Sequence, residues 1–472
     1  MILLPGRDLE LKNSKTVDFT EGSILRHLIG FSLPMFLGNL LQALYNTVDS
    51  IWVGRFLGHE ALAAVSVGFP VIFSLIALIS GITMATTIMV SQYFGAQEED
   101  RVTKTINNSV LLLTVCGAIV SVVGVVFRRP LLQMINTPED IIDLADAYLG
   151  VFMTGLVAMF LYNVASSVLR GLGDSRTPLR FLAYTTVLNI VLDPVFIFGL
   201  GPIPPMGVKG AALATVLSQV VSAVLALRYL YVSSGLVHYK PGTFRPDWEL
   251  TGLTFRIGLP AGIQQALVSL GALVVSALVN SFGATVVAGF GAAARIDHFA
   301  FMPAMSIGIA VSALVGQNMG AGKTERVYET VRWSSLLGIA ITLIFSLISY
   351  FKPEFFLVWF TKEPDVIREG ALYLKYMSFS YIPMSLMLTL GGVLRGAGDT
   401  TSTMVITLIS LWVVRVPLAK YLSTLPQLGV AGVWLGIVLS SLSGFLLHYA
   451  FYKAGRWQEK AVASREVQPS KG

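Results

Sequence analysis

The sequence contains little charge and only one cysteine. Charged residues make up 13% of its 472 residues and hydrophobic residues 54%, and the mean hydropathy is +0.71. Soluble globular chains carry charge on about a quarter of their residues, so this composition excludes that class. The lone thiol, Cys116, excludes an intramolecular disulfide and any multi-cysteine metal or iron–sulfur site, and we expect it to be a packing residue.

A cleavable signal peptide is also missing. The first 23 residues are polar and of mixed charge, without the apolar core that such a peptide needs. We therefore expect the first apolar helix to serve as the insertion signal. The net charge of +6 does not point to a nucleic-acid partner, because basic cytoplasmic loops are its ordinary cause in a membrane chain.

In place of charge, the chain has long apolar runs that recur from one end to the other. They reach the roughly 20 residues that cross a bilayer as a helix, and they lack the period-two alternation of a membrane barrel. The sequence therefore predicts an all-α polytopic membrane protein. We expect transmembrane helices near residues 24–54, 60–93, 102–127, 140–169, 178–199, 207–232, 250–281, 285–318, 327–351, 367–394, 402–423 and 428–452.

Lysine and arginine gather in one set of the loops between these twelve predicted helices. With both termini placed in the cytoplasm, 22 of the 33 basic residues fall inside and 9 outside, leaving Arg295 and Arg415 within the membrane. Cytoplasmic loops of membrane proteins are enriched in these two residue types. We therefore expect both termini to be cytoplasmic.

The chain also repeats itself. Gln92-Tyr-Phe-Gly-Ala96 recurs as Gln317-Asn-Met-Gly-Ala321, and Leu169-Arg-Gly-Leu-Gly-Asp174 recurs as Leu394-Arg-Gly-Ala-Gly-Asp399, each shifted by 225 positions. This predicts two six-helix halves with the same orientation, related by an axis along the membrane normal. We expect two pseudosymmetric bundles around a central cavity. The expected domains are a cytoplasmic N-terminal segment (1–23), an N-lobe (24–232), a cytoplasmic linker (233–249), a C-lobe (250–452) and a cytoplasmic tail (453–472).

Asp49 lies deep inside the first predicted span, close to Gln42, Asn46 and Thr47. An aspartate at the centre of a membrane helix costs about 2.5–3.5 kcal/mol on insertion scales, so it normally faces a polar interior and serves a function. We interpret Asp49 as half of an ion-binding site that drives transport. Gln42 and Asn46 are candidates for the wall of the substrate cavity.

Asp193 is the second intramembrane acid of the N-terminal half. Asn189 precedes it by four residues and shares its helix face, while Pro194 weakens the helix there and would free carbonyl oxygens. Two carboxylates in a low-dielectric pocket cannot easily both carry charge, so the pair can hold a proton. Alternatively, a sodium ion can neutralise them within a shell of oxygens. The competing interpretation is a buried polar network that only packs helices.

The C-terminal half breaks this symmetry, because the segments that match the two acids hold no acid and one of them carries Arg415. Arg295 either lines the cavity or bonds to carbonyl oxygens. His298 has no partner cluster for a metal. Met302 and Met384, which lie near prolines, are candidates for an adaptable apolar wall of the substrate cavity.

The Leu-Arg-Gly-Leu-Gly-Asp motif superficially resembles a phosphate-binding loop. It follows a membrane helix rather than a strand, which excludes the dinucleotide-binding interpretation. We expect Gly171 or Gly173 to end one helix in a left-handed cap, and Thr177 and Pro178 to begin the next as N-cap and first helical residue. A structural or gating role is favoured over contact with substrate.

Together these residues resemble the MATE (multidrug and toxic compound extrusion) family over roughly residues 24–455. The resemblance rests on the two halves, on Leu33-Pro34 and Leu259-Pro260 at the openings of helices 1 and 7, and on the two repeated motifs. It implies cation-coupled export of amphipathic, often cationic drugs. It also implies a monomeric transporter, which is not an enzyme and uses no cofactor. The implied partners are small-molecule drugs or dyes and membrane lipids.

The acids resemble the N-lobe cation site of the DinF-type branch. This resemblance implies a coupling site of Asp49, Asp193, Asn189, Asn163 and Thr215, with Asp49, Asn189, Asp193 and Thr215 as the ligands if the ion is sodium. Tyr148 and Gln42 match polar residues near that site, and Tyr148 is a further candidate for the wall of the substrate cavity. The NorM-type branch uses a Glu in helix 7 and an Asp in helix 10, where this chain has Val268 and Met384. The resemblance therefore leaves the N-lobe as the coupling site.

The sequence thus predicts a proton- or sodium-coupled multidrug antiporter of a prokaryotic inner membrane. Cation binding at the acid pair would exclude drug from the same lobe, or bend helix 1 at Pro34 as a hinge. The alternative is a flippase for lipid-linked precursors or polysaccharide, which would need a strongly basic cavity. Two basic residues within the membrane, Arg295 and Arg415, are too few to form such a cavity. A membrane prenyltransferase would need Asp-rich metal motifs, which the sequence lacks.

Overall fold

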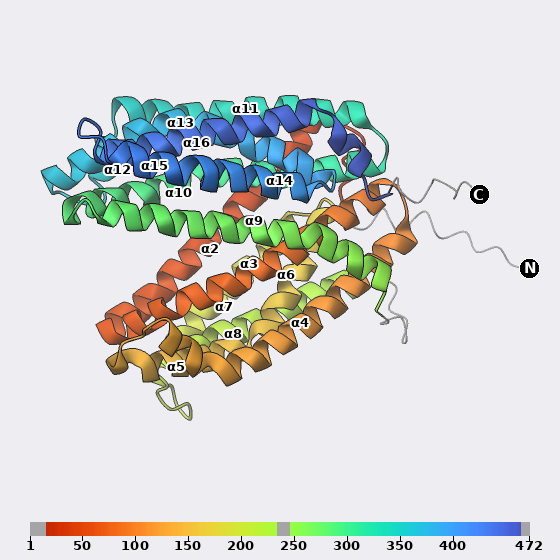
Figure 1. Cartoon of the computed structure of the whole chain (residues 1–472). Coiled ribbons are helices and arrows are strands. Elements are labelled where there is room, and N and C mark those ends of the chain that lie inside the picture. Colours follow the sequence, from red (N-terminus) through yellow and green to blue (C-terminus); the bar gives the residue numbers. More distant parts are fainter. Residues whose placement is uncertain (1–15, 234–245, 464–472) are drawn as a thin grey trace, which may run out of the picture. The chain divides into compact units, whose positions relative to one another are not determined.

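The structure, a computed structural model, describes residues 16–233 and 246–463, and these residues fold almost wholly into helices (Figure 1). Every predicted span is met by a helical segment, so the expected all-α polytopic architecture is confirmed. The elements are α2 (Ile24–Phe56), α3 (His59–Gly95), α4 (Glu99–Met134), α5 (Glu139–Thr154), α6 (Leu156–Gly171), α7 (Arg176–Phe198), α8 (Val208–Arg228), η2 (Tyr229–Ser233), α9 (Trp248–Asn280), α10 (Ala284–Gly320), α11 (Thr324–Phe351), α12 (Glu354–Leu357), α13 (Pro364–Gly396), α14 (Thr400–Thr407), η3 (Leu408–Arg415), α15 (Val416–Ser423), α16 (Val430–Lys453) and η4 (Arg456–Lys460).

Ten spans in the described part of the chain are long and apolar enough to cross a membrane. Helices α5 and α6 form an eleventh if they count as one span, bent by 48° at Gly155. A Cβ atom on Gly155 would lie 2.6 Å from a methyl carbon of Val216, so only glycine allows α8 this close. Helix α3, part of whose side chains are not described, has 37 residues at the position of the second predicted span.

Contacts divide the chain into two compact units. Unit 1 comprises Leu37–Val90 and Glu98–Arg256 with the chain before Asp18, and unit 2 comprises Asp18–Phe36, Ser91–Gln97 and Ile257–Gly472. Helix α2 therefore begins in unit 2 and ends in unit 1, whereas α9 begins in unit 1 and ends in unit 2. Residues 234–245 of the expected linker lie outside the described residues, as do 1–15 and 464–472.

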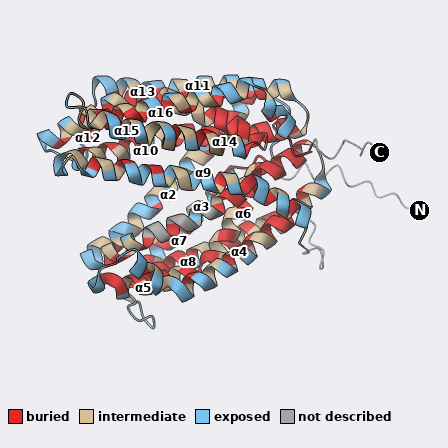
Figure 2. Cartoon of the chain, in the orientation of Figure 1, coloured by how far each residue is buried: buried red, intermediate tan, exposed pale blue. Residues whose placement is uncertain are grey.

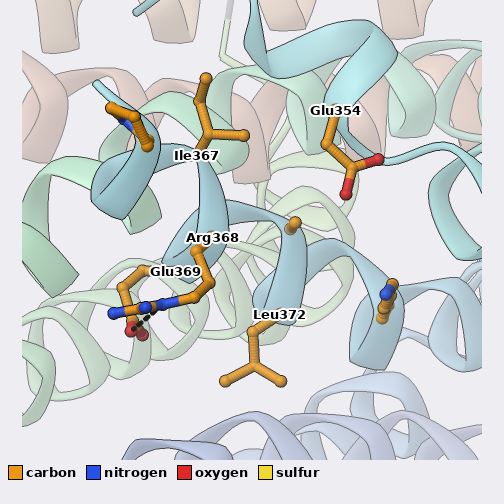
Figure 3. Close-up of a pocket in the computed structure, with 8 residues that line it drawn as sticks. Glu354, Ile367, Arg368, Glu369 and Leu372 are labelled. Atoms are coloured by element: carbon orange, nitrogen blue, oxygen red, sulfur yellow. Dashed lines mark ion pairs between the residues drawn. The ribbon is translucent and has the colours of Figure 1, made fainter. Parts of the chain in front are cut away.

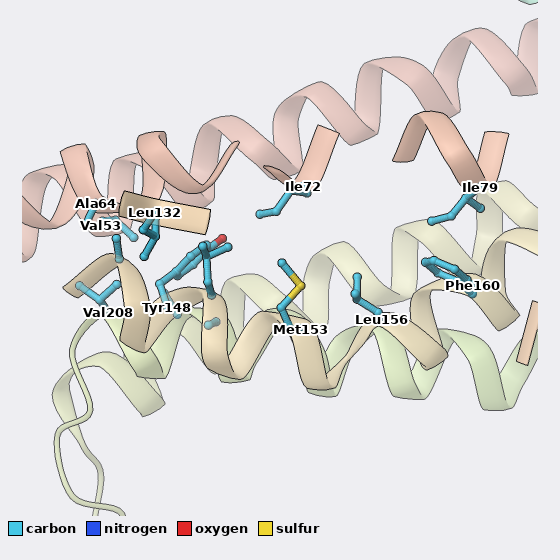
Figure 4. Close-up of a cluster of buried hydrophobic side chains, with 14 of the residues drawn as sticks. Val53, Ala64, Ile72, Ile79, Leu132, Tyr148, Met153, Leu156, Phe160 and Val208 are labelled. Atoms are coloured by element: carbon cyan, nitrogen blue, oxygen red, sulfur yellow. The ribbon is translucent and has the colours of Figure 1, made fainter. Parts of the chain in front are cut away.

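Unit 1 has an apolar core built along α5 and α6 (Figure 4). Met153, Leu156 and Phe160 lie in a row there, and Gly117 and Gly124 of α4 lie opposite them. A Cβ on Gly124 would come within 2.7 Å of the Met153 sulfur. Membrane helices associate largely through such close packing of small residues, because the surrounding lipid is as apolar as the core.

Unit 2 packs around α10 and α13. A Cβ on Gly392 would lie 2.5 Å from the carbonyl oxygen of Gly308, and one on Gly396 would lie 2.6 Å from that of Ser312. Glycine thus lets the two backbones touch along two turns. In α10, 72% of the most apolar stretch is buried, against 17% in α9, so α10 is central and α9 leaves much of its surface exposed (Figure 2).

The repeated Leu-Arg-Gly-x-Gly-Asp motifs form the expected helix ends. Gly173 and Gly398 take the left-handed conformation, with φ of 83° and 92°. The prediction that Thr177 caps the following helix and Pro178 is its first residue is wrong, because α7 already begins at Arg176 and Asp174 Oδ1 accepts the Thr177 N–H at 2.9 Å. A carboxylate accepts these N–H groups more strongly than a hydroxyl does.

Candidate functional site

Helices α2 and α7 bring the two predicted acids into the interior of unit 1. Asp193 is fully buried, and its Oδ1 accepts a hydrogen bond of 3.2 Å from Asn189 Nδ2, one turn earlier on α7. Asp49 of α2 lies close enough for its charge to act on Asp193. The i,i+4 spacing of Asn189 and Asp193 therefore produces the contact that helix geometry predicts.

Three buried oxygens of this cluster lack a hydrogen-bond donor among the described residues. They are Asp49 Oδ1, Asp193 Oδ2 and Asn189 Oδ1, and none of the recorded ion pairs involves either acid. A buried acceptor without a donor costs about 1–3 kcal/mol, and more when it is charged. Hard oxygen ligands from carboxylates and an amide suit a proton or a sodium ion. The cluster is thus chemically able to take up a cation.

Tyr45 belongs to this cluster, although the sequence analysis did not select it. It precedes Asp49 by one turn of α2, it is 6% exposed, and its hydroxyl approaches Thr215 of α8 without hydrogen-bond geometry. The charges of both acids act on it. The i,i+4 spacing from Asp49 is the signal that would have found it.

Tyr148 of α5 also faces the cluster. Its ring stacks on Phe152 with centroids 6.0 Å apart, and Asp49, Tyr45 and Asp193 all act electrostatically on its hydroxyl. The ring is buried in the apolar core, as Figure 4 shows. Because Tyr148 is buried beside the acids, it closes one side of the cluster.

The other residues predicted in unit 1 have no recorded contact with the two acids in the described part of the chain. Asn163 Nδ2 donates to the Met159 carbonyl one turn back on α6 at 2.8 Å, and no described contact joins it to the acids. Gln42 Nε2 donates to Asn46 Oδ1 at 3.3 Å, and both side chains are exposed on α2. These two therefore offer polar groups at the surface of α2 rather than inside the cluster.

The sequence analysis did not select the buried acid of α10 in unit 2 as a site. Asp297 of α10 accepts hydrogen bonds from the hydroxyls of Tyr373 at 2.5 Å and Tyr381 at 2.6 Å, both on α13. Each carboxylate oxygen thus has a donor. The neighbouring Arg295 and His298 are exposed.

The two methionines predicted in the substrate cavity, and Arg415, take different positions in unit 2. Met302 is 3% exposed and lies in the packed interior, whereas Met384 is only partly buried. Arg415 ends the π-helix η3, and its Nε donates to Ser440 Oγ at 2.7 Å.

Two surface pockets are recorded in the described parts of the chain, and neither includes Asp49 or Asp193. The pocket of unit 2 has a volume of about 670 Å³ at the start of α13, where Arg368 and Glu369 form an ion pair of 4.0 Å (Figure 3). The pocket of unit 1, about 540 Å³, lies at the start of α8, beside Lys209. In the acid cluster itself, Asp193 is fully buried and Asp49 is partly buried.

Comparison with known proteins adds independent information. The sequence profile of the MatE family matches residues 34–195 and 260–421. The probable multidrug resistance protein YpnP of Bacillus subtilis is 36% identical over 444 residues, covering 94% of this chain and 98% of its own. The probable multidrug resistance protein NorM of Thermotoga maritima is 30% identical over 443 residues, covering 94% and 95%.

The fold also matches a solved structure. That structure is an outward-facing conformation of a multidrug resistance MATE family transporter of the MOP superfamily. It superposes with a TM-score of 0.86 at 25% sequence identity, over 95% of this chain and 99% of the other. The match confirms the predicted fold class.

Proposed function

The chain belongs to the MatE family of membrane transporters, and from this premise we propose that it is a cation-coupled multidrug efflux antiporter. The family is one of transporters rather than enzymes, and the bacterial relatives are multi-pass membrane proteins of the same length class. Their names as multidrug resistance proteins support the export of amphipathic, often cationic compounds by this chain.

The observation that carries the proposal is an acid pair in which Asp193 is buried, Asp49 is partly buried and each has a buried oxygen without a recorded donor among the described residues. Asp49 and Asp193 repel each other when both are charged, and no described basic side chain neutralises them. One proton or one sodium ion would remove that repulsion. A cationic drug competes for the same negative charge, so cation and drug each lower the affinity for the other. This reciprocal exclusion couples their opposite fluxes.

We assign the coupling residues to unit 1 on the same grounds, as in the DinF-type branch. Asp49, Asp193, Asn189 and Thr215 would hold the ion, and Tyr45 would add a hydroxyl that the sequence analysis missed. Sodium would use the carboxylate, amide and hydroxyl oxygens, whereas a proton would be shared by the two carboxylates alone. Asn163, which bonds to its own helix, supports the site at longer range.

Pro34 is the proposed hinge of α2. It lies two residues before the point at which α2 passes from unit 2 to unit 1, between Phe36 and Leu37. A proline ring removes one helical hydrogen bond and clashes with the carbonyl four residues back, so bending costs least there. We also propose, from the distribution of basic residues, that both termini are cytoplasmic and that the two units correspond to an N-lobe and a C-lobe.

The test is transport in proteoliposomes with separately imposed proton and sodium gradients. Asp49→Asn and Asp193→Asn should each reduce gradient-driven dye efflux by about 100-fold or more, while Asp143→Asn, at an exposed acid of α5, should keep the native rate. The gradient that drives the native protein identifies the ion. Native rates in both buried-acid variants would refute the proposal, and transport of a lipid-linked pyrophosphate instead of dyes would favour the flippase.

A further inference from the structure

The segment just before α2 is held in unit 2 through its backbone. Arg326 of α11 donates from Nη2 to the carbonyl oxygens of Phe19 at 2.9 Å, Glu21 at 3.0 Å and Gly22 at 3.1 Å. Lys323 Nζ donates to the Thr20 carbonyl at 3.0 Å. Four consecutive carbonyl groups are therefore bound by two cationic side chains, which form stronger hydrogen bonds than neutral donors do.

Two amides complete this arrangement. Asn318 Nδ2 donates to the Phe19 carbonyl at 3.2 Å, while its Oδ1 accepts from Arg326 Nε at 3.1 Å. Gln317 Oε1 accepts the Phe19 N–H at 2.9 Å. We call Gln317, Asn318, Lys323 and Arg326 the carbonyl clasp. Because the clasp binds backbone atoms, it fixes the position of the segment without depending on its side chains.

The first turns of α2 add an apolar anchor to the clasp. Phe19 is 1% exposed and meets the Phe31 ring edge-on at 5.6 Å. Ile24 and Leu28 are fully buried in a cluster with residues of α10 such as Ile307. The start of α2 and the segment before it are thus part of the core of unit 2.

The clasp uses the second copy of the repeated sequence motif. Gln317 and Arg326 are nine residues apart, as are Gln92 and Arg101 in the first copy. Gln92 also binds backbone within unit 2, accepting the Val462 N–H at 2.5 Å and donating to the Gly396 carbonyl at 2.8 Å. In unit 1, Arg101 pairs with Glu249 in the first turn of α9 at 3.7 Å. The glutamine of each motif copy therefore binds backbone in unit 2, and the arginine nine residues later contacts the start of a helix that passes from one unit to the other.

We propose that the carbonyl clasp is a fixed anchor that keeps Phe19–Phe36 in unit 2 throughout the transport cycle. This inference rests on the proposed function, because it says how a change at Asp49 would be converted into movement. Asp49 lies 15 residues beyond Pro34, or about 22 Å along a helix. With the start of α2 fixed, displacement at Asp49 must appear as bending of α2 near Pro34. Without the anchor, α2 could move as a rigid whole, and displacement at Asp49 would not bend the helix at Pro34.

Arg326 is a positioning residue in this proposal, since it touches neither ion nor drug. Lysine cannot replace it fully, because its single nitrogen cannot bind the three carbonyl oxygens and Asn318 Oδ1 together, whereas the guanidinium uses Nη2 for the former and Nε for the latter. Arg332, exposed on the same helix and without a recorded partner in the described residues, is the matched control.

The first experiment measures amide hydrogen exchange of the full chain in lipid nanodiscs. We expect peptides from Phe19–Phe36 to exchange slowly and equally, within about twofold, in native protein and in Asp49→Asn. Exchange there should rise at least about tenfold in Arg326→Gln and not in Arg332→Gln. If Phe19–Phe36 loses protection in Asp49→Asn as much as Leu37–Phe56 does, the fixed anchor is refuted. A third result would separate the two proposals. If Asp49→Asn changes exchange in neither Phe19–Phe36 nor Leu37–Phe56, while Arg326→Gln still increases exchange in Phe19–Phe36, the anchor is supported and the coupling role of Asp49 is refuted.

The second experiment fixes the anchor chemically. In a Cys116→Ala background, Thr20→Cys and Lys323→Cys are joined by a short bifunctional methanethiosulfonate that a reductant removes. A fixed anchor predicts that the cross-linked protein, in which the bridge replaces the contact of Lys323, transports dye within about twofold of the native protein. It also predicts that Arg326→Gln transports less dye than native protein and that the cross-link restores its transport. Loss of transport on cross-linking, recovered with reductant, would show that the segment must detach and would overturn the proposal.

Discussion

The two units bury their acids in opposite ways. In unit 1, Asp49 and Asp193 each retain an oxygen without a donor, and their charges repel. In unit 2, both oxygens of Asp297 accept tyrosine hydroxyls at 2.5 and 2.6 Å. Burial of a carboxylate in a membrane helix is therefore not enough to identify a coupling site. An acid whose oxygens are satisfied by the protein holds helices together, whereas one left unsatisfied is available to a cation.

The largest expected effect separates Asp193 from Asp297. Asp193→Asn should reduce gradient-driven dye transport by about 100-fold, because the site can no longer exchange its cation. Asp297→Asn should leave the transport rate per folded molecule within about threefold of native and instead lower the amount of folded protein. Transport and fluorescence-detected size exclusion on the same preparations check this. If Asp297→Asn reduced the transport rate per folded molecule as much as Asp193→Asn does, the two acids would not differ in the way proposed.

The next effect concerns stability. Tyr373→Phe and Tyr381→Phe each leave one buried oxygen of Asp297 without a donor, which should cost about 1–3 kcal/mol in the free energy of unfolding. Tyr45→Phe removes a hydroxyl that has no recorded partner in the described residues, so it should change that free energy by less than about 0.5 kcal/mol. Thermal unfolding of the purified variants compares the three. Equal losses in all three would show that the tyrosines of the two units do not differ.

A smaller effect should appear at the cation site itself. Tyr45→Phe is expected to weaken the cation dependence of transport by about three- to tenfold, since the hydroxyl lies beside Thr215 and both acids. The concentration of the driving cation that gives half-maximal transport would measure this shift. Tyr184→Phe, at an exposed tyrosine of α7, is the control and should leave that concentration unchanged.

Much of the fold could be predicted from the sequence, because apolar runs near 20 residues have few alternatives in lipid. The predicted spans of 285–318 and 428–452, for example, differ from α10 and α16 by at most a few residues. The passage of α2 from one unit to the other could not be predicted. It depends on contacts of Phe19 with Gln317 and Arg326, about 300 residues away.

The candidate site was partly accessible from the sequence for the same reason. Asn189 and Asp193 meet because helix spacing is local, and Tyr45 could have been found by that rule. The partners of Asp297 could not, because Tyr373 and Tyr381 lie 76 and 84 residues along the chain. Nothing in the sequence near Asp297 states that its oxygens are satisfied, which is the property that distinguishes the two units.

The most direct test of the central claim is the cation released when drug binds to the purified protein. Calorimetry in buffers of different protonation enthalpy counts protons, and a sodium-selective electrode counts sodium ions. The account predicts that the native protein releases about one cation for each drug molecule bound, that Asp49→Asn and Asp193→Asn release none, and that Asp297→Asn releases as much as the native protein. Unchanged release in Asp193→Asn, or loss of release only in Asp297→Asn, would contradict the assignment of coupling to unit 1.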